Sequence, residues 1–223
     1  SKFNPDGTKE WTKLLGTSEY DGAGALTTGL DGSIYIAGTT SGDLDGQTNS
    51  GFYDVFLSKF NPDATKDWTK LLGSSEDDGY ISQEENHLLH IGSLTTGSDG
   101  SIYIASGTKG DLDDQTNSGL DDAFLSKFNP DGTKEWTKLL GSSKEDGAFS
   151  LTTGSDGSIY IAGETKGDLD GQINSGDFDI FISKYNTDGA KEWTKLIGTS
   201  EYDGAPALTT GLDGSIYITG ITS

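Results

Sequence analysis

Apolar residues along the chain gather in short runs separated by glycine, aspartate and asparagine. The first complete set of runs is ALTTG (25–29), SIYIAG (33–38), DVFLSKFN (54–61) and KDWTKLLG (66–73). Val, Ile, Tyr, Phe and Trp are concentrated in these runs, as β-strands prefer, and turn residues bound each run. The pattern therefore predicts four short β-strands in succession, with no convincing helical period except in EENHLLHIG within 84–92.

Two kinds of tight turn connect the predicted strands. DG pairs occur at 31–32, 99–100, 156–157 and 213–214, and NPDG occurs at 4–7 and 129–132. Glycine after aspartate suits a turn that needs positive φ, and proline presets one φ value. Ala64 replaces the glycine in one copy, and NTDG at 186–189 lacks the proline. These departures indicate natural drift between copies of one unit.

The strand pattern is an internal repeat. Successive tryptophans, Trp11, Trp68, Trp136 and Trp193, are 57, 68 and 57 residues apart. The long interval contains an extra segment at 80–92, so the period is about 57 residues with one interruption. We expect one domain, 1–223, made of four such repeats.

Four antiparallel strands per unit, repeated around a ring, form a β-propeller. Each sheet buries its faces only against its neighbours and needs only a thin apolar layer on each face. The chain's 31% share of hydrophobic residues is therefore sufficient to form the buried core. The repeats share DVFLSKFNPDGTKEWTKLLG, then an acidic DG, then ALTTGSDGSIYIAG. This pattern resembles the bacterial β-propeller repeat family known as SBBP, over the whole chain except 80–92. The resemblance implies an all-β propeller and a repeat module of a larger extracellular or cell-surface protein, without a shared catalytic motif.

The ends of the chain allow two arrangements of the fourth blade. The chain begins inside the DVFLSKFN motif and ends where an acidic loop would begin, so one copy of the segment equivalent to 42–57 is missing. In one arrangement, residues 1–15 supply the outer two strands of a blade whose inner strands lie in 205–220, which closes a four-bladed ring and protects the sheet edges. In the other, the chain is part of a longer array or assembles with another copy.

Charge and composition exclude several partners. The 36 acidic residues outnumber 15 basic ones, all lysine, giving a net charge of −21. A field this negative repels polyanions, and no arginine is present for bidentate phosphate recognition. Nucleic acid is therefore not expected as a partner, nor is membrane insertion, because no apolar run approaches the length that spans a bilayer. The absence of cysteine excludes disulfides and thiolate metal sites.

Acidic loops between the second and third strands are the candidate metal sites. GDLDGQTNSG (42–51), GDLDDQTNSG (110–119) and GDLDGQINSG (167–176) place carboxylate and amide oxygens at spacings close to those of calcium loops, without the bidentate glutamate. The candidate ligands are Asp43, Asp45, Asn49, Asp54, Asp111, Asp113, Asn117, Asp122, Asp168, Asp170, Asn174 and Asp179. The same residue types also serve simple turn chemistry, so calcium binding and a purely structural loop are both open. Adjoining loops on the same face add Asp21, Asp78, Asp146 and Asp203.

Candidate ligand-binding residues lie in the loops and in the insertion. His87 and His90 are the only histidines, both in the insertion, where they could bind a transition metal or a partner. Tyr20 and Tyr202 are candidates for sugar contact, although the equivalent positions 77 and 145 hold Asp and Glu. The tryptophans alternate with lysine and threonine, which favours packing over sugar stacking.

The sequence favours a non-enzymatic module that acts as a scaffold or binding platform, with any calcium held structurally in the acidic loops. A lectin-like carbohydrate-binding propeller is the alternative. A hydrolase using paired carboxylates is a third class, for which no nucleophile and base recur together in the repeats. The protein or glycan partner is not identified by the sequence.

Overall fold

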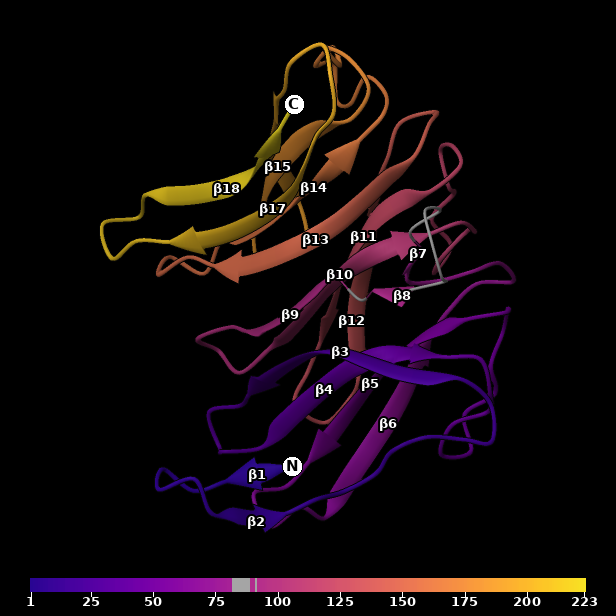
Figure 1. Ribbon diagram of the computed structural model, residues 1–223, viewed down its shortest axis with the longest axis vertical. Coiled ribbons are helices and arrows are strands. Elements are labelled where there is room, and N and C mark those ends of the chain that lie inside the picture. The colour runs from indigo at the N-terminus through magenta and orange to yellow at the C-terminus, as the bar shows by residue number, and fades with distance from the viewer. Residues whose placement is uncertain (82–88, 91) are drawn as a thin grey trace.

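The computed structural model describes residues 1–81, 89–90 and 92–223, and all regular elements in these residues are β-strands (Figure 1). Unit 1 comprises β3 (Asp21–Thr28), β4 (Ile34–Thr40), β5 (Asp54–Phe60) and β6 (Lys66–Leu72). Unit 2 comprises β9 (Ser93–Thr96), β10 (Ile102–Thr108), β11 (Asp122–Phe128) and β12 (Lys134–Leu140). Unit 3 comprises β13 (Asp146–Thr153), β14 (Ile159–Thr165), β15 (Asp179–Tyr185) and β16 (Lys191–Ile197). Each unit is a four-stranded antiparallel sheet in sequential order.

Two-stranded sheets flank the three units. The N-terminal half-sheet is β1 (Lys2–Phe3) with β2 (Lys9–Trp11), and the C-terminal half-sheet is β17 (Asp203–Thr210) with β18 (Ile216–Thr222). A further pair, β7 (Tyr80–Ile81) and β8 (Leu89–His90), lies in the insertion. The predicted four-stranded antiparallel units are therefore confirmed as the building block of the chain.

The predicted turns are confirmed by their backbone angles. Gly32, Gly100, Gly157 and Gly214 of the DG turns have φ between 80° and 86°. In the turns between the third and fourth strands, Gly7, Gly132 and Gly189 also have positive φ, and Ala64 takes the same conformation at φ 68°. Ala64 thus holds a backbone geometry that its side chain disfavours, because the turn geometry is fixed by the strands on either side.

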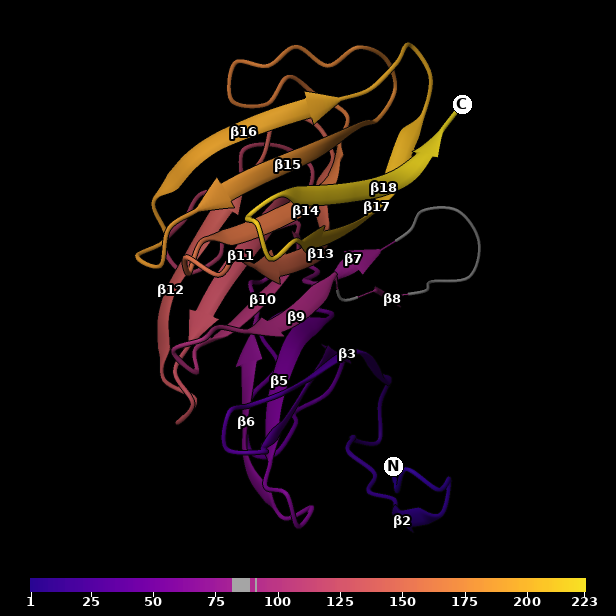
Figure 2. The same cartoon turned by 90° about the vertical axis from the view of Figure 1, so that its left-hand side faces the viewer.

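The first strands of successive units lie side by side. β9 contacts both β3 and β13, and β13 contacts β17, so these strands form a row through the molecule (Figures 1 and 2). Thr96 Oγ1 donates to the carbonyl of Thr28 at 3.1 Å, and Thr210 Oγ1 donates to that of Thr153 at the same distance. These bonds fix neighbouring units against each other at equivalent positions.

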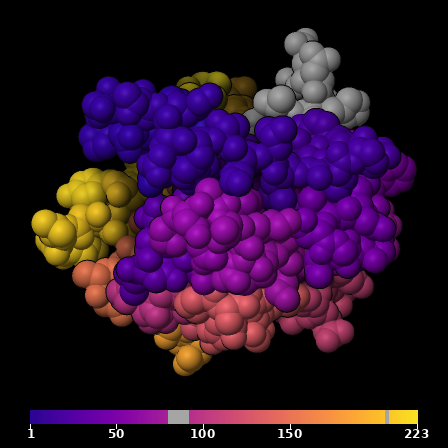
Figure 3. Space-filling model, turned by 90° about the horizontal axis from the view of Figure 1, so that it is seen from below, coloured from indigo at the N-terminus to yellow at the C-terminus, as the bar shows by residue number. Residues whose placement is uncertain are grey.

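Alternating residues on the central strands pack against opposite neighbours. In β10, Ile102 and Ile104 join a core shared with unit 1, whereas Tyr103 and Ala105 join a core shared with unit 3. This is the period-two alternation of a strand, used here with both faces apolar. All seven residues of β5, β10, β11 and β14 are buried, and the units pack without separation in the view from below (Figure 3). The sheets therefore depend on one another for burial.

The tryptophans of units 1 and 2 bind their own sheet to the next one. Trp68 packs on Tyr35 with ring centroids 6.0 Å apart, and its Nε1 donates to the carbonyl of Pro130 in the last turn of unit 2 at 3.3 Å. Trp136 repeats this arrangement with Tyr103 and with the carbonyl of Thr187 in unit 3. These contacts support the packing interpretation of the repeated tryptophan.

Pairing of the two chain ends, one of the two arrangements that the sequence allows, is not formed in this structure. β18 pairs with β17 and β1 pairs with β2, and the two half-sheets lie at opposite ends of the molecule (Figure 1). β1 has only two residues, so it offers little backbone to a partner strand. The outward faces stay open as a result: Tyr217 is 57% exposed, whereas its equivalents Tyr35 and Tyr103 are each 1% exposed.

The insertion enters unit 2 at the position where units 1 and 3 have a β-bulge. In units 1 and 3 the first strand shifts register between Ala23 and Ala25 and between Ala148 and Ser150, which leaves one extra residue in each. In unit 2 the equivalent position is expanded into the insertion, and β9 is only four residues long. A bulge already interrupts the hydrogen-bond ladder there, so the added residues leave the rest of the sheet intact.

We expect substitution of equivalent tyrosines to destabilise the protein to different extents, because only some of them are buried between two units. Tyr103→Ala removes a side chain buried between units 2 and 3, and we expect it to lower the free energy of unfolding by about 3–5 kcal/mol. Tyr217→Ala changes the same repeat position on the open end and should cost under about 1 kcal/mol. Urea unfolding followed by tryptophan fluorescence measures both variants, and equal losses would contradict this account of the fold.

Candidate functional site: acidic loops and paired aspartates at the sheet junctions

The tip of each acidic loop is a tight turn closed by its own backbone. In unit 1, Leu44 and Gln47 exchange two backbone hydrogen bonds of 3.0 and 2.9 Å. The two central residues, Asp45 and Gly46, have φ of 53° and 77°, as a type I′ turn requires. The loop leucine, Leu44, Leu112 or Leu169, is 1% exposed in each unit. The loop is thus a turn anchored in the core by its leucine.

The carboxylate at the loop tip already has partners on the fourth strand. Lys66 forms an ion pair with Asp45, and Thr69 Oγ1 donates to Asp45 Oδ2 at 2.5 Å. Partial burial opposes ionisation of Asp45, but these two donors hold its pKa below the usual value. Asp113 and Asp170 have the equivalent partners in units 2 and 3: Lys134, Thr137, Lys191 and Thr194. These three aspartates therefore face β6, β12 and β16 rather than the other candidate ligands.

The structure brings the first aspartate and the asparagine of each loop together. The backbone N–H of Asn49 donates to Asp43 Oδ1 at 2.9 Å, and Asn49 Nδ2 donates to the carbonyl of Thr40 at 3.0 Å. The same bonds recur for Asp111 with Asn117 and for Asp168 with Asn174. The pattern is the side-chain to backbone bonding of a structural turn.

The fourth candidate of each loop is a buried aspartate that begins the third strand. Asp54, Asp122 and Asp179 are each 0% exposed. A backbone N–H binds each one, as when Ser118 donates to Asp122 Oδ2 at 3.0 Å. The carboxylate lies against the glycine of the KLLG or KLIG motif, where an added Cβ would overlap it. The glycines are Gly73, Gly141 and Gly198. This contact explains why the fourth strand ends in glycine.

A second buried aspartate lies at the same junction and begins the first strand of the next unit. Ser142 donates to Asp146 Oδ2 from its backbone N–H at 2.6 Å and from its hydroxyl at 2.8 Å. Asp21, Asp78 and Asp203 are held in the same way by Thr17, Ser74 and Thr199. The sequence places these four aspartates on the same face as the acidic loops without naming them as ligands, and a serine or threonine four residues before each one is the signal for this contact.

The two aspartates of a complete junction influence each other's ionisation. Burial is the main cause that raises the pKa of Asp122 to about 6, and the charge of Asp146 raises it further. Burial also raises the pKa of Asp146, and it raises that of Asp78 to about 6 with a contribution from Asp54. At the last junction the pKa of Asp203 is instead lowered, chiefly by the hydroxyl of Thr222. The complete junctions thus hold carboxylates that resist ionisation.

One oxygen of most of these carboxylates has no hydrogen-bond partner. The atoms are Oδ1 of Asp21, Asp78, Asp122, Asp146 and Asp179, all buried. An ionised carboxylate buried without a partner is costly, so the group takes up a proton or a cation. Within the described ranges, no three His, Cys, Asp or Glu side chains converge as a metal site. A cation at a junction would therefore use two carboxylates together with hydroxyl and carbonyl oxygens, which is chemistry that calcium accepts.

The candidate tyrosines directly precede two of the junction aspartates, Asp21 and Asp203, in the chain. Tyr20 packs edge-on against Tyr53 with ring centroids 6.0 Å apart and is 46% exposed. Tyr202 packs against Phe178 at 5.9 Å, and its hydroxyl donates to Glu164 Oε1 at 3.0 Å. His87 falls outside the described residues, and only the backbone of His90, in β8, is described.

Comparison with known proteins gives one informative similarity. The chain is 29% identical over 214 residues to the regulatory protein FlaEY of Caulobacter vibrioides. The match covers 86% of this chain and 21% of that protein, so the chain spans about a fifth of the relative's length. No protein-family model matches the chain. Among the described residues there is no helix with the length and apolar character needed to cross a membrane.

We expect the buried aspartates to make the protein more stable as pH falls from 7 to 4.5 in EDTA. Their folded-state pKa of about 6 at Asp78 and Asp122 lies above the unfolded value near 3.8. The stabilising contribution of protonation is thus complete below the unfolded pKa and is lost as pH rises through about 6. Each unit of difference corresponds to about 1.4 kcal/mol.

The pH effect is separated from general charge repulsion by two variants. Asp122→Asn has no proton to lose, so the slope of unfolding free energy against pH should become shallower. Asp43→Asn changes an exposed loop carboxylate and keeps the oxygen that binds Asn49, so it should retain the wild-type slope. Chemical denaturation at several pH values measures the slopes. Stability that falls steadily on acidification would contradict the assignment.

Proposed function

We propose that the chain is a non-enzymatic β-propeller-type repeat module that serves as a rigid scaffold or binding platform within a larger secreted or surface bacterial protein. The observation that carries this proposal is the mutual burial of identical sheets, with open half-sheets at both ends. The three units are interpreted as blades, and the row of first strands as the inner strands of a propeller. The open ends allow further units to continue the stack.

Two further observations support a structural role. The same buried contacts recur in each unit, so the repeated residues are explained by packing and turns rather than by repeated chemistry. The match to about a fifth of a much longer protein is what a module inside a larger chain would give. The high negative charge argues against a nucleic-acid partner.

We further propose that calcium is a structural ion of this module and that it binds at the sheet junctions rather than at the loop tips. The tip carboxylates of Asp45, Asp113 and Asp170 are already paired with lysine, whereas the junction carboxylates have oxygens without partners. A divalent cation between Asp122 and Asp146 would remove their mutual repulsion and join unit 2 to unit 3.

Carbohydrate binding remains the second candidate function, on one observation. Tyr20 is half-exposed at the first junction, as a sugar-stacking residue would be. Its contact with Tyr53 and the contact of Tyr202 with Phe178 are equally explained by packing, because both are edge-on aromatic pairs at equivalent junctions. Binding on a glycan array that is lost in Tyr20→Ala would favour this function over the scaffold.

The scaffold proposal predicts a fixed, large separation between the chain ends. The chain has no cysteine, so Ser1→Cys with Ser223→Cys allows dyes to be attached only at the two ends. We expect single-molecule energy transfer to give one narrow, low-efficiency population. A high-efficiency population would mean that the ends meet in a closed ring, and a broad distribution would mean that the units are not held rigidly. Either result would contradict an open rigid scaffold.

The calcium proposal predicts a stabilisation that depends on the junction. At a calcium concentration 100 times the dissociation constant, the free energy of unfolding should rise by about 2.7 kcal/mol for each occupied junction. Asp146→Asn should abolish the share that comes from the junction between units 2 and 3, whereas Asp43→Asn at the loop should retain the full gain. Thermal melting with calcium and with EDTA measures the effect. A gain abolished by Asp43→Asn and retained by Asp146→Asn would place the ion in the acidic loop instead.

A further inference from the structure

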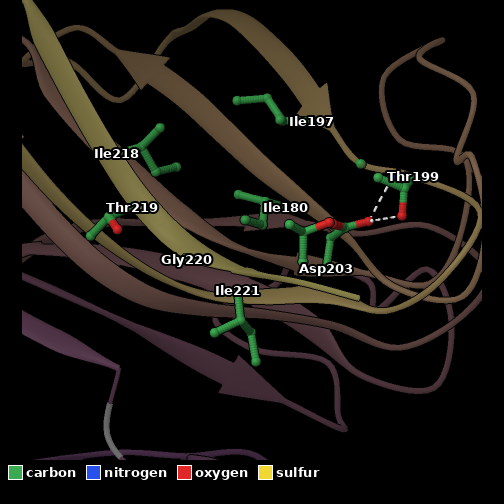
Figure 4. A pocket seen from close by; sticks show the side chains of 10 residues that line it. Ile180, Ile197, Thr199, Asp203, Ile218, Thr219, Gly220 and Ile221 are labelled. Atoms are coloured by element: carbon green, nitrogen blue, oxygen red, sulfur yellow. Dashed lines mark hydrogen bonds between the residues drawn. The ribbon is translucent and has the colours of Figure 1, made fainter.

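An apolar cleft opens where unit 3 meets the C-terminal half-sheet. It has a volume of about 310 Å³ and lies between the ends of β15 and β16 on one side and β18 on the other (Figure 4). Its apolar side chains are those of Ile180, Ile197, Ile218 and Ile221, and Gly198 and Gly220 also line it. Ile197 and Ile221 are 50% and 57% exposed. The two side chains thus stand largely open to solvent where unit 3 meets the half-sheet.

The equivalent positions at the two complete junctions are closed. Leu72 and Leu140 occupy the position of Ile197 and are 4% and 3% exposed. At these junctions the space is filled by the leucine of the next unit's acidic loop and by the phenylalanine of its third strand. These residues are Leu112 with Phe124, and Leu169 with Phe181, all at most 1% exposed.

In units 1 and 3 the second strand has a glycine opposite that phenylalanine, whereas unit 2 has Ser106 there. The ring of Phe56 lies over Gly38 and the ring of Phe181 lies over Gly163, each where an added Cβ would stand. Gly220 is the equivalent glycine in β18, and the side chain closest to its Cβ position is Ile180 from the neighbouring unit. The cleft therefore has the shape of a site whose leucine and phenylalanine are missing.

The edge of β18 is also open for a strand in a defined register. In unit 1, β4 pairs antiparallel with β5 so that Gly38 faces Phe56 and Thr40 faces Asp54. β18 has the sequence pattern of β4 and pairs only with β17. A third strand in the same register would place its phenylalanine opposite Gly220 and its aspartate opposite Thr222.

The N-terminal residues do not supply this strand. Ser1, Lys2 and Phe3 match only the last three residues of the motif, Ser58 to Phe60, and lack the loop leucine and the phenylalanine. They also lie with β2 at the other end of the molecule (Figure 1). Pairing of β1 with β18, in one molecule or between two, would leave the cleft unfilled.

We propose that the cleft and the edge of β18 are a docking site for one kind of segment: an acidic loop followed by a third strand of the same repeat, supplied by another repeat unit. The segment adds a strand to the half-sheet and buries its leucine and phenylalanine against the four isoleucines. Main-chain pairing with β18 provides affinity, and the two side chains provide specificity. This inference rests on the proposed scaffold function, since it identifies what binds at the open edge of the half-sheet.

The test uses the intact chain and a labelled peptide with the sequence of residues 42–60, GDLDGQTNSGFYDVFLSKF. We expect saturable one-to-one binding by fluorescence anisotropy and a higher melting temperature with the peptide present. A matched peptide with Leu44→Asp and Phe56→Asp keeps the loop and strand lengths, and it should bind at least tenfold more weakly. Hydrogen exchange should show new protection at the amides of β18 that do not pair with β17.

Two protein variants locate the site. Ile197→Asp changes a half-exposed residue of the cleft and should weaken peptide binding at least tenfold. Ile173→Asp changes an isoleucine that is 79% exposed in an acidic loop, and it should leave binding unchanged. A circular dichroism spectrum and melting curve of each variant show that it is folded.

Three results would overturn the inference: no binding at millimolar peptide, equal binding of the two peptides, or protection that appears away from β18. The end-to-end energy-transfer measurement separates this failure from failure of the proposed function. Low transfer without peptide binding would reject only the docking site. High transfer without binding would reject the open scaffold as well.

Discussion

The structure depends on burial of both faces of each sheet by its neighbours. A single four-stranded sheet of this sequence would expose Ile102 and Ile104 on one side and Tyr103 and Ala105 on the other, and it would have no core of its own. Stacking buries both faces of the central sheet. The outward face of the C-terminal half-sheet has no neighbour, and its Tyr217 stays exposed. The stability of such a chain is therefore a sum of unit and interface contributions, as in other repeat architectures, and the interfaces contribute the larger share of apolar burial.

The same interfaces also contain buried carboxylates, which are the most strongly polar groups of the interior. Two aspartates at each complete junction are tied to backbone N–H groups and to serine or threonine hydroxyls, and they fix where one unit ends and the next begins. Buried polar groups of this kind add specificity of register to an apolar contact that by itself would permit sliding. The cost is carboxylate oxygens without donors, which makes the junctions responsive to protons and cations.

Much of the fold could be predicted because the determinants are local and repeated. The Asp–Gly pairs require positive φ, and the alternation of SIYIAG and DVFLSKF defines strands with two buried faces, so strand order and turn geometry followed directly. Closure could not be predicted, because it depends on the relative placement of half-sheets far apart in the sequence. The candidate site was predicted in part: Asp54, Asp122 and Asp179 are the buried loop aspartates, but their neighbours at the junction come from the next unit. The acidic spacing of the loop tips indicated metal ligands. The donors that bind the Asp45 carboxylate, Lys66 and Thr69, lie 21 and 24 residues away in the sequence, so the spacing did not predict them.

The bulge in the first strand of units 1 and 3 has a consequence for diversification. At this position unit 2 accommodates eleven additional residues while β10, β11 and β12 keep the pairing seen in the other units. A ladder that already carries an unpaired residue can be lengthened there without moving its neighbours. Units 1 and 3 thus each offer one permissive point of growth, at Gly24 and at Phe149, and unit 2 has its insertion at the equivalent point. Individual repeats can acquire distinct surface segments through this point while the shared framework remains under a single set of packing constraints, and the same point is a rational place to graft a foreign peptide.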